Sequence, residues 1–498
     1  MSTQITASLL YNLVQCPHRV TMDLFEDPSR KDAENPFVEL LWERGNAFEK
    51  EVIDGLEVPF TDLRSYSGEE KQRLTLEAMT RGDSLIYGGR IETDGLLGDP
   101  DLLRRVGNGY VAGDIKSGAG EEGATEDTDG KPKKHYAVQL ALYTDILEQL
   151  GVAGSRIPFV WDVHRNEVPY DLDAPQGVRT PATLWNVYQS CMKDAQNIVG
   201  ESSQTRPALG GVCKLCHWRS ACIKLLEESD DLTLIPELGR VRRDAMCSHL
   251  RTVRDLAGAD LRTYIRGNKT IISGIGPETL AKFHARASLQ IKPGAKPYLK
   301  ERLVLPSTDI ELFFDIETDP MRNLCYLHGF VERRGGEIGT ERYVAFFAET
   351  PTSEGEERAF AEAWAYVGFY RPCAIYYYSP YERTNWRGLQ KRYPHIATED
   401  EIEALFTADT TVDLYTDVVR SKTEWPTRDY SIKTLASFLG YKWRDNHPSG
   451  AASIEWYHRW VETGDPEIRQ RILDYNEDDC IATRVLLDGI GGLPLTGV

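Results

Sequence analysis

The stretch Gly98-Asp99-Pro100-Asp101, followed by Gly113-Asp114-Ile115-Lys116, decides how the first part of the chain folds. Side chains alternate along a strand, so Asp114 and Lys116 are expected to point to one face. Asp101, on the neighbouring strand, then completes a cup of two carboxylates beside an ammonium group. Glycine-rich turns separate the β-type runs around this stretch, and they predict a strand meander over residues 85–91, 96–103 and 110–116.

This group of side chains suits a hard divalent cation. Mg²⁺ and Mn²⁺ bind few carboxylates and fill their other positions with water and phosphate oxygens, which Asp101 and Asp114 would allow. Such an ion lowers the pKa of a bound water and shields a phosphodiester. Lys116 could orient that water or stabilise the developing charge. The alternative is a solvated hairpin with ordinary charges.

The order Gly-x-Pro-Asp, hairpin, Asp-x-Lys resembles the signature of PD-(D/E)XK nucleases. Gln139 and Tyr143 share a face of a helix predicted over residues 136–150, and Gln-x-x-x-Tyr at this place resembles the RecB-type branch. The resemblance implies catalytic roles for both residues. Upstream, Glu49 stands where that branch carries His, and the resemblance implies that it is a further metal ligand.

Three late cysteines have a spacing typical of metal sites, C-x2-C-x5-C, and a fourth ligand could come from the start of the chain. This arrangement around a RecB-type core resembles the AddB and CRISPR-associated nucleases, which implies a [4Fe–4S] cluster held by four thiolates. Zn²⁺ on the same thiolates, or with His217 or His18 in place of one, is the alternative. The four candidate ligands are Cys16, Cys213, Cys216 and Cys222.

Composition limits the class of protein. The chain has 498 residues, which is enough for two or three domains, and a formal net charge of −19, which argues against a broadly basic nucleic-acid coat protein. No apolar run approaches the roughly 20 residues that cross a bilayer, and the first residues do not resemble a secretory signal. We therefore expect a cytoplasmic protein without a membrane partner, in which nine cysteines do not form a disulfide framework.

Two other segments predict less regular structure. Residues 117–135 are rich in Gly and acids and predict a mobile loop with a basic end. From residue 230 to about 300 the pattern predicts short helices, and Gly274 and Gly276 resemble the turn of a helix-hairpin-helix motif, whose backbone N–H groups bind phosphate. A plain helix–helix turn is the alternative.

A second acidic pattern begins near residue 312. Asp315 and Glu317 are two apart in an apolar strand and so share one face, and Tyr475 and Asp479 share a face of a late helix. Further strand-like runs with helices between them predict a layered α/β domain.

Asp-x-Glu early and Tyr-x-x-x-Asp late resemble the DEDD exonucleases of the RNase H-like fold. The resemblance implies two metal ions held by Asp315, Glu317, Glu382 and Asp479, with Glu382 standing where Asp is usual. It also implies that Tyr475 orients the attacking water.

The predicted architecture is α/β, with a restriction-endonuclease-like domain at 1–229, a helical helix-hairpin-helix-like segment at 230–300 and an RNase H-like DEDD domain at 301–498. The expected function is a metal-dependent nuclease acting on DNA, at single strands or ends, in repair, processing or defence. RNA is the less favoured substrate, and a helicase could act in trans because no ATP-binding glycine-rich Lys loop is visible. The alternative is a nucleic-acid-binding or scaffold protein in which one or both sites are inactive.

Overall fold

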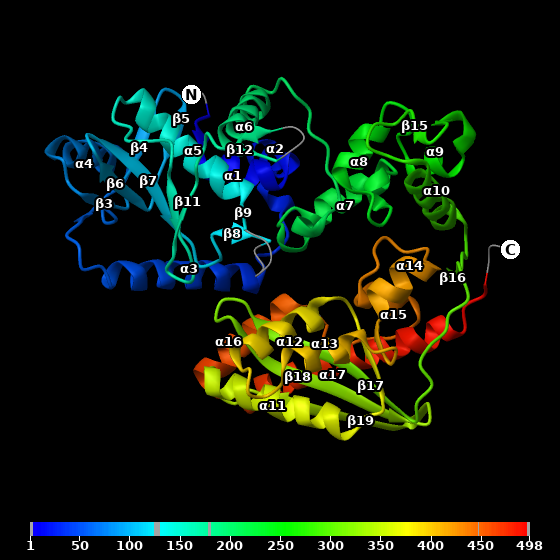
Figure 1. Cartoon of the computed structure of the whole chain (residues 1–498). Coiled ribbons are helices and arrows are strands. Elements are labelled where there is room, and N and C mark those ends of the chain that lie inside the picture. Colours follow the sequence, from blue (N-terminus) through cyan, green and yellow to red (C-terminus); the bar gives the residue numbers. More distant parts are fainter. Residues whose placement is uncertain (1–2, 124–129, 178–180, 447, 496–498) are drawn as a thin grey trace. The chain divides into compact units, whose positions relative to one another are not determined.

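The computed structural model describes residues 3–123, 130–177, 181–446 and 448–495 (Figure 1). The chain divides into two compact units, residues 1–207 with 211–224, and residues 208–210 with 225–498. The predicted middle segment therefore lies in the second unit, and the division into three domains stays a prediction. Within the part of the chain that the structure describes, no helix is long and apolar enough to cross a membrane.

The predicted meander in the first unit contributes to two sheets rather than one. Gly88 has a positive φ of 64°, and Pro100, which has no N–H for a ladder, separates β5 from β6. A three-stranded sheet has the order β1 (Ile5–Thr6), β5 (Leu96–Gly98), β4 (Ile91–Thr93). A six-stranded sheet has the order β11 (Glu167–Pro169), β10 (Phe159–Trp161), β7 (Gly109–Ile115), β6 (Leu102–Val106), β3 (Leu85–Tyr87), β2 (Thr61–Asp62).

Helix α5 (Lys134–Gln149) is the centre of the first unit. Its side chains are buried on nearly all sides, and it contacts β7, strands β4 and β5 of the small sheet, and helices α1 and α6. Short strands β8 (Glu121–Glu122) and β9 (Lys131–Pro132) pair within the predicted loop, whose residues 124–129 lie outside the described residues. The other elements are α1 (Ala7–Gln15), α2 (Pro17–Phe25), α3 (Pro36–Asp54), α4 (Gly68–Arg81), β12 (Pro175–Gln176), β13 (Ala182–Thr183), α6 (Leu184–Val199), η2 (Gly211–Leu215) and α7 (Arg219–Glu228).

Residues 230–300 have their own apolar core and include a feature that the sequence did not predict. The turn at Gly274 follows a two-stranded hairpin rather than a helix, because Gly267-Asn268 forms a two-residue turn with Gly267 at φ 60°. The elements are α8 (Gly239–Met246), α9 (Val253–Ala257), β14 (Ile265–Arg266), β15 (Lys269–Thr270) and α10 (Pro277–Ile291).

The rest of the second unit is built on a five-stranded sheet. Strands β17, β18 and β19 pair antiparallel in turn. Strand β20 pairs parallel with β17, and β21 pairs parallel with β20. The order is β19 (Glu337–Phe347), β18 (Leu324–Arg334), β17 (Ile310–Asp319), β20 (Ala374–Tyr377), β21 (Thr411–Asp413). A separate pair joins β16 (Tyr298–Leu299) to β22 (Thr423–Glu424).

Helices cover both faces of this sheet (Figure 1). Leu312, Phe314 and Ile316 of β17 pack with helices α11 to α13, whereas Phe313 packs with α15 and α17 on the other face. By alternation, Asp315 and Glu317 lie on the face of Phe313. The helical segments are α11 (Ser353–Phe369), α12 (Tyr381–Arg392), α13 (Glu399–Thr407), η5 (Leu414–Val419), α14 (Arg420–Lys422), α15 (Ile432–Phe438), α16 (Gly450–Thr463) and α17 (Pro466–Gly491).

Candidate active sites

The structure brings Asp101, Asp114 and Lys116 together in the first unit. The register Leu102↔Gly113 places Asp101 beside Asp114, whose Oδ1 accepts from the Asp101 N–H at 3.5 Å. Lys116 Nζ lies 2.9 Å from Asp114 Oδ2, and the Ile115 N–H donates to Asp101 Oδ2 at 2.8 Å. The two carboxylates and the ammonium therefore form one cluster, as the hairpin pattern indicated.

Burial and the neighbouring charges shift the pKa values of the groups in this cluster. Burial, with the negative charges of Asp114 and Glu49, raises the pKa of Asp101 to about 8, although Lys116 opposes the rise. Burial lowers the pKa of Lys116, but the carboxylates of Asp114 and Asp101 outweigh burial and raise it overall. Lys116 therefore stays charged. The carboxyl group of Asp101 needs a further positive charge nearby to ionise.

Gln139 and Tyr143 line one side of the cluster from α5. Gln139 Nε2 donates to the Tyr143 hydroxyl at 3.0 Å, and that hydroxyl donates to the Asp99 carbonyl at 3.4 Å. Burial, with the charges of Asp114 and Asp101, raises the pKa of Tyr143 well above its usual value. Glycine is required at position 98, because a Cβ there would lie 2.5 Å from the Tyr143 ring.

Glu49 reaches the cluster from α3. Its carboxylate accepts from the Tyr87 hydroxyl at 2.6 Å, and its charge helps to raise the pKa of Asp101. Glu49 is therefore close enough to Asp101 to act on it electrostatically, and it is held by a partner from β3.

Cys16 lies between α1 and α2, and the three later cysteines lie from η2 to α7. All four are half-buried, and Cys216 and Cys222 pack against an apolar group that includes Trp218. Burial, and then the charges of Cys216, Cys16 and Cys213, raise the pKa of Cys222 to about 12. The four thiols thus act on one another, and four such thiolates would need a cation to stay ionised, which fits a four-thiolate metal group.

The histidines of the alternative zinc set have other partners. His217 Nε2 lies 2.9 Å from Asp23 Oδ1, and His18 Nδ1 lies 2.9 Å from the Thr205 hydroxyl. Each contact occupies one ring nitrogen only, and metal-bound histidines commonly make such a contact with the nitrogen that does not bind metal, so a set that includes a histidine stays an alternative.

The second acidic cluster joins β17 to α17. Ligand oxygens of Asp315, Glu317 and Asp479 all lie within 4.8 Å of one another. Among the described residues, this is the one group of three or more His, Cys, Asp or Glu side chains that meets so closely. The strand alternation of the acids and their meeting with the late helix match the sequence prediction in geometry.

Polar neighbours hold these carboxylates in place. Asn476 Nδ2 donates to Asp315 Oδ2 at 2.7 Å, and the Tyr343 hydroxyl donates to Asn476 Oδ1 at 2.8 Å. Trp443 Nε1 donates to Asp479 Oδ1 at 2.7 Å. Sequence reasoning assigned no role to these residues. Tyr343 and Trp443 lie outside both acidic motifs, and Asn476 lies inside the Tyr475–Asp479 stretch but at a position that the Tyr-x-x-x-Asp pattern leaves open.

The carboxylates of this cluster repel one another. Burial, and then the charge of Asp479, raise the pKa of Glu317 to about 8. Burial, with the charges of Glu317, Asp479 and Glu382, raises the pKa of Asp315 well above its usual value. Such a cluster is stabilised when bound cations allow all its members to ionise.

Glu382 begins α12 and is 3 % exposed. Burial raises its pKa well above the usual value, and the charges of Asp413, Asp479 and Glu317 add to the rise. Its Oε2 has no hydrogen-bond partner among the described residues. Asp413, in contrast, accepts from the N–H groups of Ser379, Tyr415 and Thr416, which gives it a structural role as a cap.

Lys433 of α15 is a further site residue that sequence reasoning missed. Its Nζ lies 2.8 Å from the Tyr475 hydroxyl and 3.1 Å from each Asp479 oxygen. No motif signals it, since it is separated from Asp479 by 46 positions. It is the ammonium counterpart of Lys116 in this second cluster.

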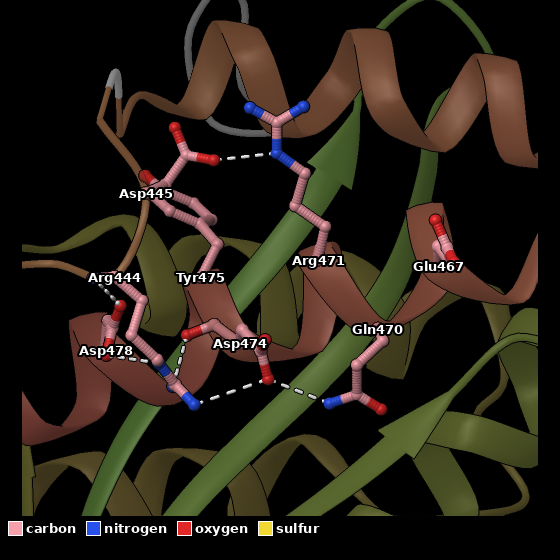
Figure 2. A pocket seen from close by; sticks show the side chains of 8 residues that line it. All are labelled: Arg444, Asp445, Glu467, Gln470, Arg471, Asp474, Tyr475 and Asp478. Carbon is pink, nitrogen blue, oxygen red and sulfur yellow. Dashed lines mark hydrogen bonds and ion pairs between the residues drawn. The ribbon is translucent and has the colours of Figure 1, made fainter.

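A pocket of about 340 Å³ lies beside Tyr475 along α17 (Figure 2). Arg444 pairs there with Asp474 and Asp478, Arg471 pairs with Asp445, and Gln470 donates to Asp474 at 2.8 Å. Two guanidinium groups therefore face four carboxylates, and the lining of the pocket is acidic overall.

Gly274 and Gly276 lie far along the chain from both acidic clusters. Gly274 has a φ of 73°, and Gly276 is the N-cap of α10. Both glycines are exposed. Their proposed contact with phosphate stays a prediction.

Two family models match this chain. One describes the PD-(D/E)XK nuclease superfamily and matches residues 19–223. The other describes the RNase H superfamily and matches residues 312–490. No curated protein matched the chain. Each matched region contains one of the two acidic clusters, so the chain carries a PD-(D/E)XK nuclease superfamily domain followed by an RNase H superfamily domain.

Proposed function

We propose that the chain is a divalent-metal-dependent nuclease with two hydrolytic sites, one in each unit, and that its substrate is DNA, as single strands or ends. The carrying observation is that buried carboxylates converge twice, each time beside a lysine, within a domain of a nuclease superfamily. Repair, processing or defence of DNA is the proposed setting, and a helicase could supply strands in trans.

In the first site, Asp101 and Asp114, with Glu49, would hold Mg²⁺ or Mn²⁺. When bound, the ion would lower the pKa of a water and shield the phosphate. Lys116 is placed to stabilise charge on the phosphate or to orient the water. Gln139 and Tyr143 form the adjoining wall, and Tyr143 keeps its proton, which its hydroxyl donates to the Asp99 carbonyl.

In the second site, Asp315, Glu317 and Asp479, with Glu382, would hold one or two such ions. Lys433 neutralises part of the charge of Asp479 and holds the Tyr475 hydroxyl in one orientation. Burial, with the charges of Asp479 and Glu317, raises the pKa of Tyr475 well above its usual value, so it acts as a hydrogen-bond donor toward water. The family resemblance favours 3′ ends for this site.

We also propose a [4Fe–4S] cluster on Cys16, Cys213, Cys216 and Cys222, which would tie the start of the first unit to its end. Zn²⁺ is the alternative occupant. Broad absorption near roughly 400 nm would support iron–sulfur over zinc alone, and metal analysis of the purified protein decides between them.

The second candidate function is nucleic-acid binding without cleavage at one or both sites. Glu49 and Glu382 favour it, because each stands where the families use another residue. If only one site cleaves nucleic acid, binding without cleavage is the function of the other site alone.

Cleavage of end-labelled single-stranded DNA and RNA with Mg²⁺ or Mn²⁺ tests the proposal. Wild type is compared with Lys116→Ala, Asp315→Ala and the double variant. Each single variant should keep the activity of the other site, and the double variant should have none. If wild type cleaves neither polymer with either ion, binding without cleavage is the function.

A further inference from the structure

Residues 239–300 reverse the charge of the chain. They hold thirteen Arg and Lys against four Asp and Glu, a formal charge of +9, in a chain whose net charge is −19. The apolar core of this segment also includes side chains from Leu226 to Leu238, and with residues 226–238, which add five acids, the formal charge is +4. Four of the thirteen cations pair with acids outside residues 239–300: Arg243, Lys282, Arg286 and Lys300. A positively charged module in an acidic protein is the electrostatic footprint of a polyanion-binding surface.

The hairpin of this module places two cations side by side. Arg266 and Lys269 are direct cross-strand partners on either side of the Gly267-Asn268 turn, and both are exposed. Like charges directly opposite each other destabilise an antiparallel pair. Arg266 Nη1 donates to the Ile265 carbonyl at 2.9 Å. Neither side chain forms an ion pair in the described part of the chain, so no carboxylate there offsets this repulsion.

The hairpin is held firmly against the turn before α10. The Thr270 hydroxyl donates to the Ile275 carbonyl at 2.5 Å, and the Ile271 N–H donates to the Tyr264 carbonyl at 2.9 Å. Ile272 and Ile275 are buried beneath it. The two charged side chains therefore project from a fixed base, and little backbone ordering is needed when they bind.

Further exposed cations lie in the same module. Arg251 and Arg254 flank the start of α9, which packs on α10, and Lys292 and Lys296 follow α10 (Figure 1). Arg262, in contrast, is bound to Asp260 at 3.0 Å. These four cations, like the pair on the hairpin, form no ion pair in the part of the chain that the structure describes.

We propose that the tip of this hairpin, Arg266 and Lys269, binds the phosphate backbone of a single-stranded nucleic acid, and that the module supplies affinity without reading sequence. This inference deepens the proposed function, because it names where substrate is held outside the two acidic clusters. Backbone neutralisation releases counterions, so binding must weaken with salt.

The test measures binding rather than cleavage. The parent is the full chain with Asp114→Asn and Asp315→Asn, in EDTA, and the probe is a fluorescent oligo(dT) of about 30 nucleotides, titrated at several salt concentrations. Arg266→Gln with Lys269→Gln should weaken binding at least tenfold, and it should reduce the salt slope by about 1.4, since each contact to a single strand contributes roughly 0.7. The matched control, Lys193→Gln with Arg358→Gln, removes two exposed charges on α6 and α11 and should change neither value.

A second variant separates charge from fold. Arg266→Lys with Lys269→Arg keeps the charge and should keep the affinity and the slope. The inference is overturned if the parent does not bind the oligonucleotide, or if the glutamine pair binds with the affinity and slope of the parent. Binding by the parent without cleavage by wild type would overturn the proposed function and leave this inference standing.

Discussion

The two acidic clusters differ in how each offsets its own negative charge. In the first, Lys116 lies 2.9 Å from Asp114, so one of the two converging carboxylates already has a half-buried cation beside it. In the second, three carboxylates meet within 4.8 Å, with Glu382 buried nearby, and Lys433 contacts only Asp479 among them. The second cluster has the larger uncompensated charge.

This difference in uncompensated charge determines how strongly each site depends on bound cations. Ionising several buried carboxylates together costs more than ionising one, because desolvation and mutual repulsion both oppose it. We therefore expect the second site to require bound ions more strongly, for both activity and stability.

The largest expected effect is on catalysis. Lys116→Ala should lower cleavage by the first site roughly 10²- to 10³-fold, the range for loss of one charge-stabilising donor. Asp315→Ala should lower cleavage by the second site at least as much, because it removes a ligand. Each rate is measured in the background that silences the other site.

Exposed residues provide the controls for these variants. Lys193→Ala and Asp400→Ala change the same charges on α6 and α13 and should leave both rates unchanged. Full cleavage activity in the variant that carries both Lys116→Ala and Asp315→Ala would show that neither cluster is the catalytic site.

The second effect concerns stability of the first unit. Cys213→Ser should destabilise it by on the order of several kcal/mol, because the free energy of metal binding is also free energy of folding. Hydrogen exchange resolved by peptide should show faster exchange in residues 3–123 and little change in residues 310–495. Cys191→Ser is the control, and an unchanged metal content in Cys213→Ser would contradict the cluster.

The third effect uses glycines that face each site. A Cβ at Gly329 would lie 1.6 Å from Asn476 Oδ1, the amide that holds Asp315, and a Cβ at Gly98 would lie 2.5 Å from the Tyr143 ring. Gly329→Ala should reduce cleavage by the second site alone, and Gly98→Ala by the first alone, each with about 1–3 kcal/mol of overpacking.

Gly388→Ala, in α12, is the matched control, because nothing lies within 4 Å of the added Cβ. Equal losses at both sites from either variant would show that the effect is global unfolding.

The effect that is smallest for each step measured, one pH unit, is the pH dependence of stability without metal. Burial first, and then neighbouring charge, raise the pKa of Asp101 and of Glu317 to about 8, from ordinary values of 3.8 and 4.5. Between pH 4.5 and 8 the unfolded chain ionises these groups and the folded chain keeps their protons. Stability should therefore fall as pH rises, by at most about 1.4 kcal/mol per pH unit for each proton.

Chemical denaturation in EDTA at several pH values measures this slope. Asp101→Asn and Glu317→Gln should each make it shallower, with the larger change for Glu317→Gln if the second cluster carries more repulsion. Stability that rises over this pH range would contradict the buried, protonated state of both groups.

The sequence predicted much of the candidate sites because strand and helix periodicity act over short distances. The alternation that puts Asp315 and Glu317 on one face, and the helical spacing of Tyr475 and Asp479, were visible in the sequence. The meander around Asp101 was predicted, but its division into two sheets was not, since Pro100 and the turn at Gly88 act through pairing partners. Strand β18 was also missed, because it is buried along most of its length and so has no alternation to detect.

The sequence by itself determined which residue types could do chemistry and on which face of an element each would lie. Only the tertiary structure decided which elements meet, and therefore that Lys433 contacts Asp479 and that Asn476 holds Asp315. The physical reason is that periodicity is a local property of the backbone, whereas contacts between distant segments depend on how whole faces pack and exclude water.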